Sequence, residues 1–179
     1  MPSTLVPPPG PDEYAPYYAR YISRVPQGDV LGFLQQQRDR VRELLAGVGE
    51  PLAGHRYAVD KWSIKGVVGH LSDAERIFAY RALRVARGDE TPLPGWDQDP
   101  YAALANFDAR SMASLAREWL SVRDATLTLF DGFDAACWTR RGTASNAPVS
   151  VRSLAYMIAG HTTHHAAILR ERYGVGGSA

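Results

Sequence analysis

The chain has 179 residues, of which 45% are hydrophobic and 22% charged, and its formal net charge is +1. This composition is typical of a folded globular domain, and the balanced charge argues against a nucleic-acid-binding protein, which usually carries a basic surplus or stripe. No apolar run of about 18 residues predicts a membrane span, no secretory signal is recognisable, and the single Cys137 excludes an internal disulfide, so we expect a cytoplasmic protein.

Residues 1–27 are predicted to form an arm outside the main domain. Residues 1–12 are rich in proline and are expected to be extended. Four tyrosines then recur at helix-like spacing: Tyr14, Tyr17, Tyr18 and Tyr21. Because aromatic stripes usually pack against a core, we expect a short helical turn that lies on the body through these tyrosines. A surface for a partner protein is the alternative.

Four long stretches of helical periodicity account for most of residues 28–174, which we take as the main domain. In each stretch apolar residues recur at three- and four-residue steps, and glycine or proline follows. The predicted helices cover residues 29–47, 63–87, 110–130 and 150–173. Residues 175–179 are expected to form a flexible tail.

Two connections between these helices are long. Residues 88–108 contain Trp96 and Asp97, which are candidates for the wall of a pocket because long ordered connections are often functional. A loop that packs only for stability explains them equally well. Residues 131–149 show no convincing strand and are expected to be irregular. Four long helices with one long crossover connection predict an all-α four-helix bundle.

Three of the five histidines lie inside the last predicted helix, within the five-residue stretch 161–165. His161 and His165 stand four residues apart, which places both imidazoles on one helix face, where they can hold one metal ion. They interrupt the apolar line between Ile158 and Ile168 and therefore point inward or toward a groove. Since this spacing is common, partly exposed histidines that bond to their neighbours are the alternative.

His70 is the candidate for a third ligand, because it lies mid-helix among apolar residues of the second predicted helix. Neighbouring helices of a bundle can bring it opposite His161 and His165, although a lone histidine there is more often a satisfied core residue. Three histidines leave a metal with an open coordination position, which is the catalytic pattern. We expect a divalent ion, zinc first, with nickel, manganese or iron as alternatives.

Three other polar residues, Asp73, Glu75 and His164, lie close to these histidines in the sequence. Asp73 lies one turn beyond His70 and is predicted to orient an imidazole. Glu75 is about 140° from His70 around the helix and is given no direct role. His164 is about 100° from His165 and is predicted to lie behind the ligands or at the surface. No general base stands out.

Two segments carry a resemblance to a known family. Residues 61–75, KWSIKGVVGHLSDAE, resemble the second-helix signature of the DinB/YfiT-like superfamily, and residues 159–169, AGHTTHHAAIL, resemble its last-helix signature. The resemblance covers roughly residues 28–173. It implies an antiparallel four-helix bundle, often homodimeric, with a divalent metal held by three histidines. Carried over by position, these ligands are His70, His161 and His165.

The resemblance also implies an activity. Characterised members of the superfamily include transferases and isomerases that use low-molecular-weight thiols such as mycothiol or bacillithiol, and others are assigned as metal-dependent hydrolases. Bound zinc suits both, because it holds a thiol as thiolate and lowers the pKa of water toward about 7. We therefore expect a metal-dependent enzyme acting on a small molecule, with a thiol-dependent S-transferase preferred. A hydrolase, or a protein that binds a metal or ligand without turnover, is the alternative.

Overall fold

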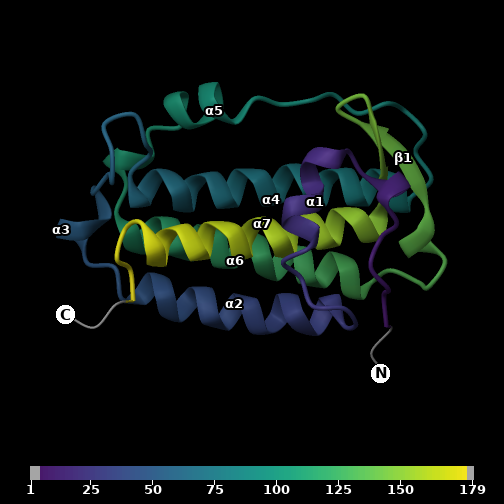
Figure 1. Ribbon diagram of the computed structural model, residues 1–179, viewed down its shortest axis with the longest axis horizontal. Helices are drawn as coiled ribbons and strands as arrows, with labels where there is room; N and C mark the ends of the chain where they lie inside the picture. Colours follow the sequence, from purple (N-terminus) through teal and green to yellow (C-terminus); the bar gives the residue numbers. More distant parts are fainter. Residues whose placement is uncertain (1–4, 177–179) are drawn as a thin grey trace.

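The computed structural model describes residues 5–176, and four long helices packed side by side form its body (Figure 1). They are α2 (Val30–Ala46), α4 (Ile64–Ala86), α6 (Met112–Asp131) and α7 (Val151–Glu171). The bundle predicted from the sequence is confirmed, and each helix boundary lies within two residues of its expected place. Residues 1–4 of the arm and 177–179 of the tail lie outside the described residues.

Residues that cap the N-termini explain why the starts of these helices could be predicted from the sequence. At each of the four N-termini a side-chain oxygen accepts a hydrogen bond from the backbone N–H three residues later. The caps are Asp29, Ser63, Ser111 and Ser150. Just beyond α4, Gly88 has a φ of +77°, a left-handed conformation that glycine adopts readily and that ends a helix.

The direction of the helices follows from the connection between α4 and α6. This connection returns along the length of the bundle, so α4 and α6 run in the same direction and α2 and α7 run opposite to them (Figure 1). It contains α5 (Gln98–Leu104) and a 3-10 turn, η3 (Phe107–Ala109). As a result, α4 packs against both α6 and α7. No helix in the described part of the chain is long and apolar enough to cross a membrane.

The expectation of an irregular segment over 131–149 is wrong for its second half. A hairpin of β1 (Arg141–Ala144) and β2 (Ala147–Ser150) lies between α6 and α7, preceded by a 3-10 turn, η4 (Cys137–Thr139). Ser145 and Asn146 both have positive φ, at 54° and 59°, which suits a two-residue hairpin turn. Pro148 argued against a strand in the sequence, because proline cannot donate a hydrogen bond to a neighbouring strand and is tolerated only where a strand has a free edge.

The N-terminal arm lies across α7. It contains η1 (Pro11–Glu13), η2 (Pro16–Tyr18) and α1 (Ala19–Ile22), and Tyr21 is buried whereas Tyr17 stays exposed. Gly160 of α7 makes the contact possible, because a Cβ atom there would lie 2.0 Å from the carbonyl oxygen of Tyr21. At the other end of the chain Val175 is buried, and its N–H donates to the carbonyl of Leu169 at 3.0 Å, so packing extends into the expected tail.

The interior of the bundle consists of two apolar clusters with a polar layer between them. One cluster lies toward the hairpin and includes Leu34, Phe78, Phe130 and Leu154. The other lies toward the short α3 (Glu50–Ala53) and includes Leu44, Leu71, Leu115 and Leu169. Between them we define the polar layer as four buried side chains, one from each long helix: Gln37, Glu75, Arg123 and Thr162. The candidate site lies at this level of the bundle.

Candidate metal centre

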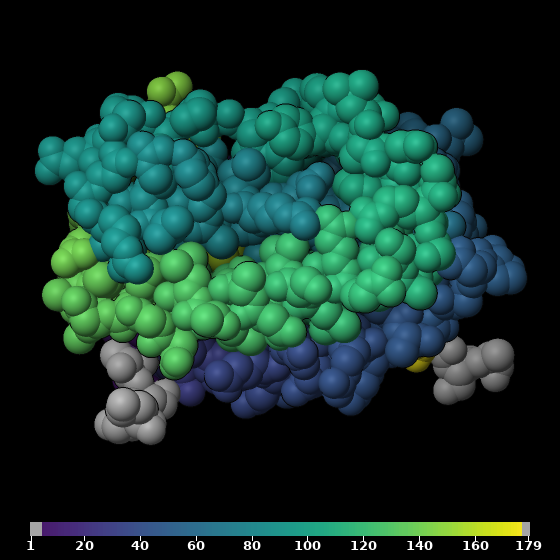
Figure 2. Space-filling model, turned by 180° about the vertical axis from the view of Figure 1, so that it is seen from behind, coloured from purple at the N-terminus to yellow at the C-terminus, as the bar shows by residue number. Residues whose placement is uncertain are grey.

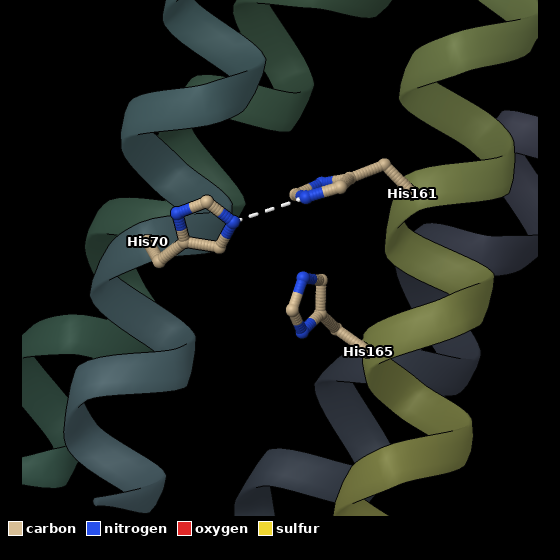
Figure 3. Close-up of side chains that lie close together, drawn as sticks. All are labelled: His70, His161 and His165. Carbon is tan, nitrogen blue, oxygen red and sulfur yellow. Dashed lines mark hydrogen bonds between the residues drawn. The ribbon is translucent and has the colours of Figure 1, made fainter. Parts of the chain in front are cut away.

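Three histidines converge between α4 and α7, as Figure 3 shows. The nitrogen atoms that His70, His161 and His165 can offer to a metal all lie within 4.8 Å of one another. The Nε2 atoms of His70 and His161 are 3.0 Å apart. The four-residue spacing places His161 and His165 one turn apart on α7, and the opposite direction of α4 brings His70 to face them.

Burial keeps these histidines uncharged. His70 is 2% exposed and His161 is 6% exposed. Desolvation lowers the pKa of His70 to about 4. Desolvation, followed by the charges of the neighbouring histidines, holds the pKa of both His161 and His165 well below the usual 6.5. Neutral imidazole is the form that ligates a metal, so the cluster is in a binding-ready protonation state at pH 7.

The donors of the cluster fit a divalent cation. His165 Nδ1 is buried and has no hydrogen-bond partner among the described residues, and an unsatisfied buried polar atom costs about 1–3 kcal/mol. A cation shared by the three rings would supply a partner for the ring nitrogens that face one another, such as Nε2 of His70 and Nε2 of His161. No carboxylate of the described residues joins the cluster, and an all-imidazole set suits zinc, nickel or iron better than magnesium or calcium.

A cavity of about 260 Å³ opens beside His70 and His161. Its walls come from the arm, from α4 and from the connection after α4, and include Tyr17, Tyr18, Tyr21, Phe78, Trp96 and Asp97. Trp96 lies nearly parallel to His70, with ring centroids 6.0 Å apart, and Tyr21 meets His161 edge to face at 5.4 Å. Trp96 and Asp97, the two pocket candidates of this connection, thus lie in the wall of the cavity. The tyrosines are site residues that the sequence analysis missed, since their spacing indicated only packing.

Asp73 and His164 lie apart from the three-histidine cluster. Asp73 forms an ion pair with Arg76 at 3.5 Å, and within residues 5–176 no hydrogen bond joins it to a histidine. Three residues along a helix leave Asp73 about 60° from His70, and this rotation turns it toward α6 and Glu118. The ring of His164 packs on Tyr21 at 5.4 Å, outside the cluster.

The polar layer beside the cluster was not foreseen. Arg123 donates from Nε and Nη2 to both carboxylate oxygens of Glu75, at 2.7 and 2.9 Å. It also donates to Thr162 Oγ1 at 3.1 Å, to Gln37 Oε1 at 2.9 Å and to the carbonyl of Leu34 at 3.3 Å. These five bonds use the full donor capacity of a guanidinium, so the buried charge is completely satisfied.

The polar layer holds the turn of α7 that carries His161. Gln37 Nε2 donates to the carbonyl of Ala159 at 2.8 Å and to Thr163 Oγ1 at 2.9 Å. Together with the bond from Arg123 to Thr162, these contacts lie on both sides of His161 in the sequence. Because Glu75 belongs to the same helix as His70, the layer fixes the position of His161 relative to His70.

Comparisons with known proteins agree with this geometry. The family model of the DinB superfamily matches residues 34–169. YfiT from Bacillus subtilis, described as a probable metal-dependent hydrolase with an unusual four-helix bundle topology, superposes with a TM-score of 0.70 at 16% identity, covering 96% of this chain and 98% of that chain. A mycothiol-dependent maleylpyruvate isomerase superposes with a TM-score of 0.70 at 12% identity, covering 88% of this chain and 64% of that chain. No curated protein matches.

At these identities the two solved structures show a shared fold and do not by themselves assign an activity. The family model is a separate finding. It spans most of α2 through α7 and contains all three converging histidines. The chain belongs to the DinB superfamily.

Proposed function

We propose that the chain is a cytoplasmic metal-dependent enzyme that acts on a small molecule and transfers a group to or from a low-molecular-weight thiol. The observation that carries the proposal is the convergence of three neutral imidazoles beside an accessible cavity. The shared fold with a mycothiol-dependent isomerase supports a thiol, and the shared fold with YfiT supports hydrolysis as the second candidate.

In this proposal His70, His161 and His165 hold the divalent ion, zinc first. Such an ion, when bound, holds a thiol as thiolate or lowers the pKa of a water molecule to about 7. The aromatic walls of the cavity offer flat surfaces on which a planar substrate can pack. Burial, followed by a hydrogen bond with Tyr17, raises the pKa of Tyr21. The Tyr21 hydroxyl therefore keeps its proton in the wall of the cavity.

Metal analysis of histidine variants tests the first part of the proposal. We expect wild type to bind one ion per chain, and His70→Ala, His161→Ala and His165→Ala each to lose it while circular dichroism stays helical. His164→Ala is the matched control, because its ring lies next to His165 but outside the cluster, and it should keep the metal. Retention of the metal by all three cluster variants would overturn the proposal.

A substrate panel tests the reaction class. The metal-loaded protein is offered thiols together with electrophilic acceptors, and separately esters and amides without a thiol. Turnover that requires the thiol supports the transferase. Turnover of an ester or amide alone replaces it with the hydrolase. A bound metal with no turnover in either panel leaves a protein that binds metal without catalysis.

A homodimer is a further part of the proposal, supported by the resemblance to a family that is often dimeric. The outer faces of α4 and α6 frame an apolar groove of about 480 Å³ that contains Tyr80, Leu83 and Leu129. Figure 2 shows this side of the molecule, with α6 across the middle and the connection over residues 88–104 above it. Sedimentation should give twice 19.7 kDa, and Leu83→Glu should reduce the mass to that of a monomer.

A further inference from the structure

We propose that the histidine cluster serves two separate compartments, so that two different small molecules bind at the same time on either side of Gln98. The inference rests on the proposed metal function and adds where the two reactants of such a group transfer would bind. The first compartment is the cavity beside His70 and His161. The second is a cavity of about 400 Å³ that reaches His165, and Gln98 lines both.

The rings around His70 show how the two compartments meet the cluster. Trp96, a wall of the first compartment, lies over His70 with centroids 6.0 Å apart. Trp62, a wall of the second compartment, approaches the same ring to 4.7 Å. Gln98, the first residue of α5, lines both compartments. Each compartment therefore has its own tryptophan next to the cluster.

His165 gives the second compartment access to the cluster. Its side chain lines that compartment, whereas His70 and His161 line the first. A ligand in the second compartment thus approaches the three rings from the side of His165, and a ligand in the first approaches from the side of His161.

The two compartments also differ in chemistry. The first is walled mainly by aromatic rings, those of Tyr18, Tyr21, Phe78 and Trp96 among them, and fits a flat apolar body. The second carries charges of both signs, from Asp60, Lys61 and Asp99, beside apolar Ile168. Lys61 and Asp60 form an ion pair at 2.7 Å. This mixture fits a zwitterion whose ammonium group meets Asp99 and whose carboxylate meets Lys61.

The four tryptophans provide reporters for an NMR test on the zinc-loaded full chain. Trp96 reports on the first compartment and Trp62 on the second, while Trp119 and Trp138 are buried and serve as internal controls. The probes are benzoate, a flat anion, and glycyl-L-serine, a zwitterion. We expect benzoate to shift the Trp96 indole signal and the dipeptide to shift that of Trp62. Each titration should give the same dissociation constant when the other probe is saturating.

Variants assign each probe to its compartment. Tyr18→Leu should weaken benzoate binding roughly three- to tenfold and leave the dipeptide unchanged, because only the aromatic wall is altered. Lys61→Met should weaken binding of the dipeptide and leave benzoate binding unchanged. Glu43→Gln, on the exposed face of α2, is the control and should change neither.

Competition between the probes, a shared set of shifted signals, or no shift of Trp62 in metal-loaded protein would each overturn the two-compartment proposal. The metal content of the same sample is measured in parallel. A sample that binds no metal contradicts the proposed function itself, and a metal-loaded sample with competing probes contradicts only the second compartment.

Discussion

The buried histidines give the metal-free protein a specific response to acid. In the unfolded chain a histidine titrates near 6.5, whereas burial lowers the pKa of His70 to about 4 in the fold. Above about pH 6.5 neither state binds the proton, so this part of the stability is complete. As the pH falls from 6.5 toward 4, only the unfolded chain takes up protons, and the free energy of unfolding decreases.

We therefore expect the melting temperature of metal-free protein to fall steadily below about pH 6.5. In His70→Gln the slope should be smaller, because one of the buried titrating groups is gone. His55→Gln removes an exposed histidine and should leave the slope unchanged. Equal slopes in all three proteins would show that the cluster is not the source of the acid sensitivity.

Gly160 permits a contact that any other residue would prevent. A change from glycine to alanine in a helix interior normally adds up to about 1 kcal/mol of stability. Here the new Cβ atom would lie 2.0 Å from the carbonyl oxygen of Tyr21, so backbone must move. We expect Gly160→Ala to destabilise the protein and to speed proteolysis within the arm. Gly54→Ala is the control, because the site has open space and an ordinary φ of −84°, and it should be nearly neutral.

At the residue level the sequence predicted the convergence of the histidines, and Trp96 and Asp97 as cavity walls, but not the tyrosines or the polar layer. The spacing of His161 and His165 defines a shared face without any knowledge of tertiary structure. The place of Asp73 depends on which helix lies beside α4, and that helix is α6 rather than α7 at this position. The pairing of Glu75 with Arg123 joins residues 48 apart, which no local pattern encodes.

The N-terminal arm is an element whose attachment depends on one buried carboxylate. Desolvation opposes the charge of Glu13, but hydrogen bonds from Arg152, Ser150 and Gly10 outweigh it and lower the pKa of Glu13 to about 2. Arg152 Nε donates to Glu13 Oε2 at 2.8 Å. Because the pKa is depressed in the fold, the stabilisation is complete above about pH 4.5 and is lost as the pH falls toward 2.

Glu13→Gln should therefore lower stability at pH 7 by about 2 kcal/mol and flatten the loss of stability between about pH 4.5 and 2. Denaturant unfolding across this range measures both effects. Glu43→Gln on the exposed face of α2 is the matched control and should behave as wild type. A variant as stable as wild type at pH 7 would show that the arm is held by its apolar contacts alone.

Helices whose apolar residues repeat at regular spacing could be predicted from the sequence. Elements whose structure depends on a turn or on contacts with distant residues could not. The four long helices carry both an apolar stripe and a cap, and two independent signals define each start. The hairpin has strands of four residues and a turn without glycine, and β1 bonds further to Leu93 of the distant connection. The seven-residue α5 buries no side chain, so it leaves no apolar stripe in the sequence.

Across the whole molecule, the polar layer links all four long helices at the level of the histidines. Arg123→Met leaves the carboxylate of Glu75 buried without its partner. The free energy of unfolding should fall by roughly 3–5 kcal/mol. Replacing both, as Arg123→Met with Glu75→Leu, should recover most of this loss. The metal affinity of the double variant should still fall about 10–100-fold, since Thr162 and Gln37 lose the donor that fixes the turn of His161.

Denaturant unfolding gives the stability of each variant, and competition with a chelator gives its metal affinity. Ser121→Ala, an exposed change on the same helix as Arg123, is the control for both measurements. A double variant that binds metal as tightly as wild type would mean that the layer contributes only to packing between the two apolar clusters.

The docking of the arm on α7 has a consequence for the order in which the chain is made. A ribosome releases Glu13 and Tyr21 early, yet their partners, Arg152 and Gly160, are 139 residues further along. Until α7 emerges, the arm lacks the helix on which it docks, and two of the three histidines do not yet exist in the nascent chain. A chain that stops before α7 therefore has His70 without the two histidines that face it, because two segments far apart in the sequence must meet to complete the same cavity.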